Sequence, residues 1–327
     1  MDQSNNRDSI QWLDKPVFNN LTITWEALIF GLILALAVLS RFYNVGARVI
    51  SHDETSHVYY AWRLFKGWGY SHDPITHGPL QFHLLALVYF IFGSSDFSAR
   101  IPTILAGVAT IAFLWKYRRY LGRWGTLAAS LMTLISPFML YYSRYVRNEA
   151  YVALFGVVTL WSILRYLETE SPRFLYWLTG VTMLHFTAKE TAFIYTAQAM
   201  ILLGLLFISK VSEKKWHLPK LRNVFLSSLI LAALLLGIGF AIQSATPPLS
   251  ESENAARTLP LGTLVALGLS GLSLLFALIV VIRGYTWQKL KNLPSFSAML
   301  LLGTLVLPQL APVPVRMLGW DPLDYSQ

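Results

Sequence analysis

Four short clusters of charged and polar residues interrupt a chain that is otherwise strongly apolar. They are residues 52–54 (HDE), 77–80 (HGPL), 143–149 (SRYVRNE) and 188–191 (AKET). A carboxylate such as Asp53 at a membrane surface can act as a general base or hold a divalent cation. Arginine and lysine side chains can stabilise negative charge through charge-assisted hydrogen bonds. Together the clusters hold residue types suited to proton transfer and to binding an anionic group.

Each cluster also has an interpretation that needs no chemistry. Asp53 can cap a helix that begins at Glu54, because short polar residues are common at that position. Pro79 suits the first turn of a helix, where no amide donor is needed. Lys189 and Glu190 can pair with one another beside the membrane. These alternatives stay open at the level of the sequence.

The clusters lie at the ends of apolar runs that predict membrane-spanning helices. The 327 residues are 55% hydrophobic and 13% charged, against roughly 25% charged in an average soluble domain, so a water-soluble globule is excluded. Runs of about 16 to 24 residues can cross a bilayer core of about 30 Å as helices. The candidate spans are about 25–42, 98–117, 125–141, 149–167, 174–186, 191–208, 224–243, 259–282 and 296–311. We therefore expect an all-α, polytopic membrane protein with about nine transmembrane helices.

A further apolar segment, Phe82–Phe92, is too short to cross, since about eleven residues of helix reach only about 16 Å. If it does not span, 16 of the 26 lysines and arginines fall on one side of the membrane, together with the N-terminal tail. The positive-inside rule makes that side cytoplasmic. Arg144 and Arg147 then lie on the extracytoplasmic side, against the charge bias, which favours a function over simple anchoring. Arg147 and Glu149 can also partly neutralise each other.

This topology leaves one large extracytoplasmic loop, residues 43–97, which holds five of the seven histidines. These five are His52, His57, His72, His77 and His83. Within the loop, Glu54–Lys66 has the apolar spacing of an interfacial amphipathic helix that stops at Gly67. Phe82–Phe92 is expected to form a second short helix against the membrane. The expected organisation is a cytoplasmic tail over 1–24, a catalytic-type core over 25–210 that includes the loop, and further transmembrane helices over 211–327.

The charge balance and the absence of cysteine exclude several other classes of protein. The net charge of +9 gives no case for nucleic acid, because basic residues in so apolar a chain mark the cytoplasmic ends of helices. Without cysteine there are no disulfides, thiolate metal sites or cysteine nucleophiles. The polar N-terminal stretch lacks the features of a removable signal peptide. The expected location is the cell membrane, in contact with membrane lipids.

Taken in order, the four clusters resemble the glycosyltransferase C superfamily. The resemblance rests on an acidic pair after the first span, a Gly-Pro-Leu turn before a lateral helix and a basic-acidic loop before the fourth span, and it covers about residues 25–210. The chain is most similar to the protein mannosyltransferase and aminoarabinose transferase branch, and within it to the prokaryotic flippase activity-associated family of archaeal-type N-glycosylation. This implies an enzyme of hexosyl or mannosyl type that moves a sugar from a polyprenyl-phosphate-linked donor to an acceptor at the extracytoplasmic face.

The resemblance also implies roles for individual residues. Asp53 matches the family's catalytic aspartate of the first loop, and Glu54 matches its acidic neighbour. The expected ligands of the donor phosphate are Arg144, Arg147 and Lys189, and the expected substrate-binding residues are His77, Glu149, Glu190 and His52. Glu149 stands where relatives commonly carry an aspartate, and Gly78 replaces a proline of the lipid-A-modifying branch. No certain cofactor is implied; a divalent cation is a candidate, with unknown ligands.

Two other functions compete with this assignment. A lipid-linked-sugar flippase or transporter would use the charges to line a path, without cleaving the sugar–phosphate bond. A metal-dependent membrane hydrolase would use His52, Asp53, His57 and either His72 or His77, but the spacing HDETSH is not the H-E-x-x-H pattern of two ligands on one helical face. Relatives usually continue beyond the last apolar run, so a truncated or split chain and a complete one both stay open as alternatives, with a second polypeptide as a candidate partner.

Overall fold

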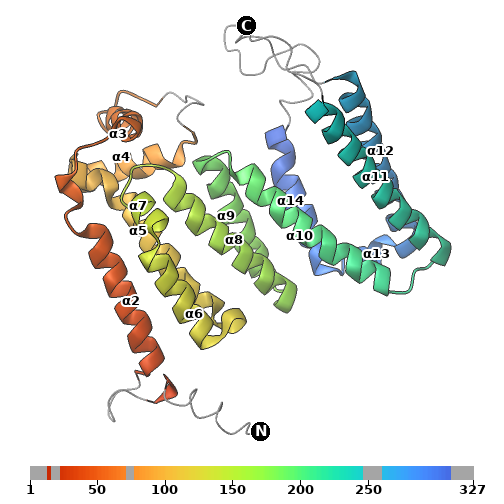
Figure 1. Cartoon of the computed structure of the whole chain (residues 1–327), viewed down its shortest axis with the longest axis horizontal. Helices are drawn as coiled ribbons and strands as arrows, with labels where there is room; N and C mark the ends of the chain where they lie inside the picture. The colour runs from red at the N-terminus through yellow and green to blue at the C-terminus, as the bar shows by residue number, and fades with distance from the viewer. Residues whose placement is uncertain (1–12, 16–22, 71–76, 246–259, 311–327) are drawn as a thin grey trace. The chain divides into compact units, whose positions relative to one another are not determined.

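The computed structural model of the chain describes residues 13–15, 23–70, 77–245 and 260–310. Within these ranges the chain is helical and forms no extended strand, which confirms the expected all-α class (Figure 1). The helices are α2 (Trp25–Phe42), η1 (Val45–Ala47), α3 (His52–Phe65), α4 (Leu80–Phe92), α5 (Asp96–Leu114), η3 (Trp115–Tyr117), α6 (Arg118–Ile135), α7 (Pro137–Ser143), α8 (Glu149–Thr169), α9 (Arg173–Ala188), α10 (Ala192–Glu213), α11 (Pro219–Ala245), α12 (Leu261–Tyr285), α13 (Trp287–Leu290) and α14 (Pro294–Leu310). They divide into two compact units, residues 1–200 with 301–327 and residues 201–300, which we describe separately.

Six helical runs are long and apolar enough to cross a membrane, so the chain is a multi-pass membrane protein. They are Trp25–Ala47, Asp96–Ile135, Glu149–Thr169, Ala192–Glu213, Pro219–Ala245 and Leu261–Tyr285. The second of these joins α5 to α6 through η3, and Gly122, with a φ of 67°, interrupts it. The helices α9 and α14, with 16 and 17 residues, are shorter than the other candidates. Helices overlap all nine predicted runs, while the total of nine crossings stays a prediction.

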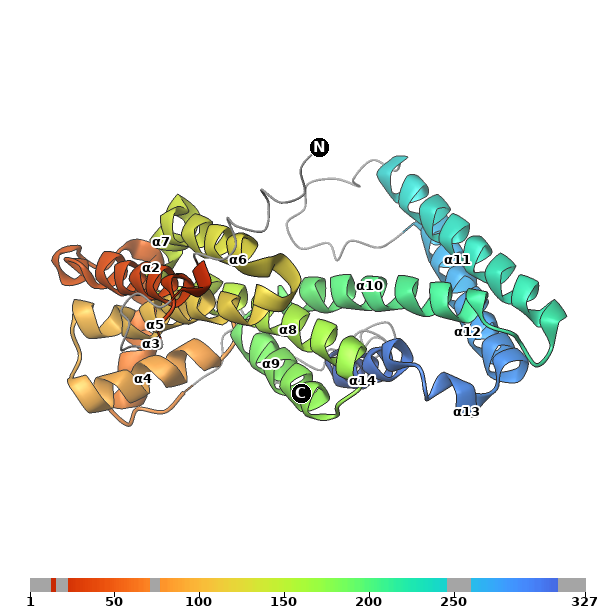
Figure 2. The same ribbon diagram turned by 90° about the horizontal axis from the view of Figure 1, so that it is seen from below.

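In the first unit, α5 packs against helices on two sides. Ile111 lies in an apolar cluster with Phe30 of α2 and Leu127 of α6. Ala106 lies in a second cluster with Phe155 of α8 and with residues of α9. Lipid tails are as apolar as leucine, so close packing, more than removal of apolar surface from water, holds such helices together. Figure 2 shows the same arrangement, with α2 beside α6 and α7.

The helices α3 and α4 lie where α2 ends and α8 begins (Figure 1). Ser51 is the N-cap of α3, and its backbone N–H donates to the Glu54 carboxylate at 3.0 Å. The helix therefore begins at His52, and the alternative in which Asp53 caps a helix that begins at Glu54 is wrong. It ends at Phe65 and is followed by Gly67 with a φ of 78°, as predicted.

The predicted second short helix is confirmed as α4, which has 13 residues and a length of about 20 Å. Its apolar side chains Phe82, Leu85 and Tyr89 are buried against Ala61 of α3 and Val146, which precedes α8. This packing fixes α3 against the loop between α7 and α8.

The second unit, residues 201–300, is built around α11 and α12, which pack side by side. Two serine hydroxyls of α12 donate to backbone carbonyls of α11, Ser270 to Ala232 and Ser273 to Ser228, each at 2.8 Å. The predicted boundary at residue 210 falls inside α10, and it stays a prediction.

Candidate active site

A cavity of about 450 Å³ lies beside the first turns of α3. Its lining residues are His52, Asp53, Thr55, Ser56, His57, Tyr59, Tyr60, His77 and Arg147. They come from α3, from His77 of the HGPL cluster, and from the loop before α8. Three of the four sequence clusters thus contribute directly to one cavity, and the fourth reaches it through the ion pairs described below.

Asp53 is the carboxylate that lines this cavity. Its side chain is 57% exposed, and its Oδ2 lies 3.2 Å from Nη1 of Arg147. Asp53 stands in the first turn of α3, where the free backbone N–H groups of the helix favour negative charge. A carboxylate has about four acceptor positions, so this one bond leaves Asp53 able to accept a proton or a further hydrogen bond.

Arg147 connects Asp53 to an ion pair between α8 and the end of α9. Nε of Arg147 lies 3.7 Å from Oε2 of Glu149, and Nζ of Lys189 lies 2.7 Å from Oε1 of the same carboxylate. Glu149 is the first residue of α8 and Lys189 follows the last residue of α9, so the packing of these two helices sets the pair. The partial neutralisation of Arg147 by Glu149 is confirmed, and the alternative pairing of Lys189 with Glu190 is wrong.

Glu190 pairs instead with His77. Nδ1 of His77 lies 2.9 Å from Oε2 of Glu190, and the N–H of Gly78 donates to the carbonyl of Ala188 at 3.2 Å. A Cβ on Gly78 would lie 2.1 Å from the carbonyl oxygen of Thr187, so only glycine permits this close approach. The HGPL and AKET clusters are therefore in direct contact, and His77 faces the cavity as expected.

His57 is the buried titratable group of the cavity wall. Its side chain stands one turn after Asp53 and stacks near His77, with ring centroids 6.4 Å apart. Burial, together with the nearby side chains of His77 and Arg147, lowers the pKa of His57 from 6.5 to about 4. The imidazole is therefore neutral at neutral pH, and its Nδ1 has no hydrogen-bond partner among the described residues.

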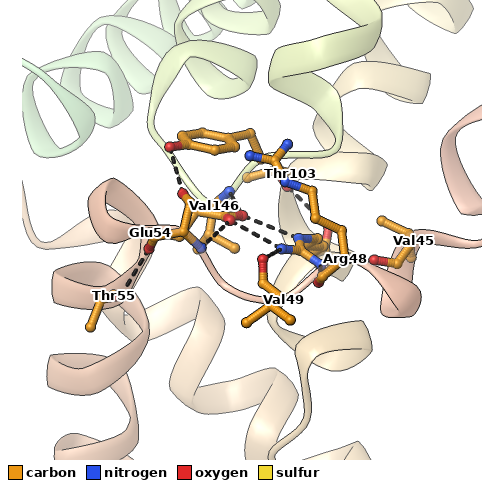
Figure 3. A network of polar contacts seen from close by, with 10 residues as sticks. Val45, Arg48, Val49, Glu54, Thr55, Thr103 and Val146 are labelled. Atoms are coloured by element: carbon orange, nitrogen blue, oxygen red, sulfur yellow. Dashed lines mark hydrogen bonds and ion pairs between the residues drawn. The ribbon is translucent and has the colours of Figure 1, made fainter.

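Glu54 has the opposite environment to its neighbour Asp53. Its side chain is fully buried and accepts hydrogen bonds from Nε and Nη2 of Arg100 at 3.1 and 3.0 Å, and from the backbone N–H of Val146 at 3.0 Å (Figure 3). With the bond from Ser51, the carboxylate accepts four. Burial alone would raise the pKa of Glu54, but these bonds outweigh it and hold the pKa below its ordinary value. Glu54 does not line the cavity, although it was expected to be catalytic.

Arg144 also lies apart from the cavity. It lines a separate cavity, and its Nη2 donates to the carbonyl of Tyr43 at 2.8 Å. The other expected ligands of the donor phosphate, Arg147 and Lys189, lie within the ion-pair chain that begins at Asp53. His72 lies outside the described residues. The described residues contain no group of three or more His, Cys, Asp or Glu placed to hold a metal ion, so the divalent cation stays a prediction.

Arg100 is the residue that the sequence analysis missed. It lies inside the apolar run expected over 98–117, and a charged residue within such a run is a signal of a buried partner or a functional site. Besides Glu54, its Nη1 donates to the carbonyls of Val45 and Arg48, each at 2.7 Å. Arg100 thus ties the segment before α3 to α5.

Similar proteins are the polyprenol-phosphate-mannose–protein mannosyltransferases of two bacteria. The protein from Mycobacterium tuberculosis is 29% identical over 104 residues, which cover 29% of this chain and 20% of that protein. The protein from Corynebacterium glutamicum is 26% identical over 157 residues, which cover 44% and 30%. The chain therefore matches a third or less of the length of these relatives. The crystal structure of the Archaeoglobus fulgidus oligosaccharyltransferase aligns with 86% of this chain and 39% of its own, with a TM-score of 0.49 and 14% identity.

The sequence profile described as dolichyl-phosphate-mannose-protein mannosyltransferase matches residues 76–242, just over half of the chain. This range includes the HGPL, SRYVRNE and AKET clusters and begins after the HDE cluster. The resemblance to the glycosyltransferase C superfamily is thereby confirmed, and the narrower flippase activity-associated assignment stays a prediction. The chain belongs to the dolichyl-phosphate-mannose-protein mannosyltransferase family.

Proposed function

We propose that the chain transfers a hexose, of which mannose is the first candidate, from a polyprenyl-phosphate-linked donor to an acceptor hydroxyl at the extracytoplasmic face. The observation that carries the proposal is the chain of contacts from Asp53 through Arg147 and Glu149 to Lys189. These contacts link an exposed carboxylate to two cations from separate segments, and Asp53 and Arg147 line the first cavity. The bacterial relatives are polyprenol-phosphate-mannose–protein mannosyltransferases, which supports the choice of donor.

In this reaction Asp53 is the general base. The acceptor oxygen attacks the anomeric carbon of the donor while Asp53 takes the hydroxyl proton. The bond between the anomeric carbon and the phosphate oxygen breaks, and its electron pair stays on the phosphate. The exposure of Asp53 leaves room for an acceptor at this carboxylate.

Arg147 and Lys189 stabilise the charge that develops on the leaving phosphate. In the free protein both cations face Glu149. Nε of Arg147 and Oε2 of Glu149 are buried without a hydrogen-bond partner among the described residues and lie 3.7 Å apart, so the two charges face each other in the free protein. Glu149 holds the two cations close together before the donor arrives. We assign His77, His52 and Glu190 to the substrate-facing wall, because two of them line the cavity and Glu190 orients His77.

Glu54 acts in this proposal as a positioning residue. Its four hydrogen bonds connect the first turn of α3 to α5 and to the loop that carries Arg147. Because Asp53 is adjacent to Glu54 and Arg147 is adjacent to Val146, whose N–H donates to Glu54, the buried carboxylate holds the proposed base and the cation near each other.

The test is sugar transfer in proteoliposomes that contain the full chain, a radiolabelled mannosyl polyprenyl phosphate and a serine/threonine-rich peptide. General base catalysis contributes about 100- to 10,000-fold, so Asp53→Asn should lower the transfer rate at least about 100-fold. Lys189→Ala should lower it as well. The matched control is Asp96→Asn, because Asp96, like Asp53, lies in the first turn of a helix but lines a different cavity.

The measurement also separates an enzyme from a flippase. The assay counts free polyprenyl phosphate as well as labelled peptide, and a flippase would move the donor across the bilayer while leaving the sugar–phosphate bond intact. Unchanged transfer in both Asp53→Asn and Lys189→Ala, with correctly inserted protein, would refute the proposed site. Release of free polyprenyl phosphate with transfer of the sugar to an acceptor other than the peptide would support the proposed site and change only the assignment of the acceptor.

A further inference from the structure

A second cavity of about 370 Å³ is lined by Arg100, the ion-pair partner of Glu54, whereas Asp53 lines the first cavity. Its lining residues are Val45, Arg48, Arg100, Pro137, Leu140, Tyr141 and Arg144. It shares no lining residue with the first cavity. No carboxylate lines it, so it lacks a group that could act as a base on a sugar or an acceptor.

Two cations of this cavity have no ion-pair partner among the described residues. The guanidinium carbon of Arg48 lies 5.7 and 5.3 Å from the ring centroids of Tyr141 and Tyr145, and Arg144 donates to the carbonyl of Tyr43. By contrast, Arg100 and Arg147 each contact a carboxylate. The aromatic rings hold the charge of Arg48 in place without neutralising it. The cavity therefore presents a net positive, partly preorganised site for an anion.

An apolar groove of about 930 Å³ adjoins this cavity. Leu140 lines both of them, and Tyr43, whose carbonyl holds Arg144, lines the groove. The groove runs between α2 and the ends of α6 and α7, and its lining residues are Leu36, Val38, Leu39, Ser40, Phe42, Tyr43, Leu134, Ile135 and Leu140. Leu39 and Ile135 are each 64% exposed, so the groove is open at the surface of a helix that can cross the membrane.

We propose that this groove and cavity bind an anionic diacyl phospholipid of the bilayer, with its headgroup phosphate between Arg48 and Arg144 and an acyl chain along α2. Arginine suits a phosphate ligand, because its planar guanidinium group can donate two parallel hydrogen bonds to phosphate oxygens. The apolar groove that continues from the two cations matches the order of headgroup and chain in a phospholipid. Because no carboxylate lines the cavity, we favour an unreactive lipid as its ligand, in preference to the polyprenyl-phosphate donor.

The test uses the lack of cysteine in the chain. Leu39→Cys introduces one thiol in the groove, which is labelled with a small fluorophore in the otherwise unchanged full chain. The labelled protein is reconstituted in phosphatidylcholine bilayers. Into these, brominated phosphatidylglycerol or, separately, brominated phosphatidylcholine is added at increasing mole fractions. The brominated acyl chains quench the fluorophore on contact. We expect half-maximal quenching at a mole fraction about 10- to 30-fold lower for phosphatidylglycerol, because each arginine near the surface contributes about a fivefold preference.

Three variants in the Leu39→Cys background decide the result. The double variant Arg48→Gln, Arg144→Gln should remove the preference for phosphatidylglycerol, and Arg48→Lys, Arg144→Lys should retain part of it. The matched control is Arg63→Gln, since Arg63 also lies over a tyrosine ring, 5.9 Å from the centroid of Tyr59, but lines neither cavity nor groove. The control should keep the full preference.

Competition identifies the bound lipid. Unlabelled phosphatidylglycerol should displace the brominated lipid, and glycerol phosphate, which has no acyl chain, should not. An equal preference in the wild-type and double-glutamine backgrounds, or the same loss in Arg63→Gln, would overturn the site. Displacement by polyprenyl phosphate at a lower mole fraction than by phosphatidylglycerol would overturn the assignment to a phospholipid, and displacement by glycerol phosphate would overturn the role of the groove.

Discussion

Replacing Arg100 with methionine should cause a large loss of stability through the carboxylate that it leaves behind. The side chains of Glu54 and Arg100 are 0% and 1% exposed, so neither group can recover contact with water when the other is removed. In Arg100→Met, Glu54 loses two of its four hydrogen bonds and keeps those from Ser51 and Val146. Removing one partner of a buried ion pair costs about 3 to 5 kcal/mol, and we expect a value in this range at pH 7.

The complementary variant should be milder. In Glu54→Gln, Arg100 still donates to the carbonyls of Val45 and Arg48 at 2.7 Å, and glutamine keeps a side-chain oxygen for the backbone donors. We expect a cost of about 1 to 3 kcal/mol. The double variant Glu54→Gln, Arg100→Met should cost less than the sum of the two single changes, since no unpaired charge remains.

The pKa of Glu54 determines how the stability of the wild-type protein and of Arg100→Met depends on pH. The folded protein holds the pKa of Glu54 below its ordinary value, so the carboxylate adds stability that is complete above the unfolded pKa of about 4.3 and is lost as the pH falls through the folded pKa. In Arg100→Met the desolvation remains and part of the hydrogen bonding is gone, so the pKa rises. The destabilisation caused by Arg100→Met should therefore be largest at neutral pH and smaller below the new pKa, where the carboxyl is neutral.

Unfolding by dodecyl sulfate in mixed micelles measures the free energy, and hydrogen exchange at the Val146 amide reports on the local contact. Exchange at this amide should become faster in Arg100→Met, because its acceptor Glu54 is no longer held by Arg100. The control is Arg63→Met, which removes an arginine of α3 that makes no ion pair among the described residues. Additive single-variant effects, or a cost below about 1 kcal/mol for Arg100→Met, would refute the reasoning.

Two further predictions concern the wall of the first cavity. Gly78→Ala should lower the free energy of unfolding by about 1 to 3 kcal/mol and break the contact between His77 and Glu190, because the new Cβ would lie 2.1 Å from the Thr187 carbonyl oxygen. The control is Gly180→Ala, where nothing lies within 4 Å of the new Cβ. Unfolding in mixed micelles should show no loss of stability in this control. The pKa of His57 is about 4 in the folded protein and about 6.5 in the unfolded chain. Between these two pH values the imidazole binds a proton in the unfolded chain only, so the stability of the folded protein falls as the pH decreases. The loss reaches on the order of 3 kcal/mol at pH 4. His57→Gln should remove this component of a stability–pH profile, and an unchanged profile would contradict the burial of a neutral imidazole.

The helical architecture and the positions of the polar clusters could be predicted from the sequence. Apolar runs and their interruptions are local signals, and α2 was expected over exactly the range that it occupies, Trp25–Phe42. The short helix α4 could also be predicted, because the apolar segment Phe82–Phe92 is too short to cross the bilayer core; the helix itself begins at Leu80. Capping was harder, since Ser51 and Asp53 are both good N-cap residues. The deciding feature is Glu54, which stands three residues after Ser51 in a capping box.

The pairing of charges could not be predicted, because it depends on contacts between segments far apart in the chain. Lys189 has an acidic neighbour in Glu190, but the packing of α8 on α9 places Glu149 closer. Arg144 and Arg147 belong to one loop and were expected to act together. They point into different cavities because the loop, with the backbone N–H of Val146 bonded to Glu54, turns between them. A sequence motif gives the residue types, whereas the tertiary structure determines which residue each of them contacts.

The adjacent carboxylates Asp53 and Glu54 show how one motif can serve two physical purposes. Successive residues of a helix point about 100° apart, so when Glu54 turns inward to Arg100, Asp53 must face the cavity. If the two side chains exchanged environments, Asp53 would be buried and Glu54 would be exposed. The ion pair of Glu54 therefore does more than stabilise α3, since it sets the rotation of the helix about its axis and with it the direction of Asp53. On this argument a variant that weakens the Glu54–Arg100 contact without unfolding the protein should lower the turnover of the proposed transfer reaction while the carboxylate of Asp53 remains chemically unchanged.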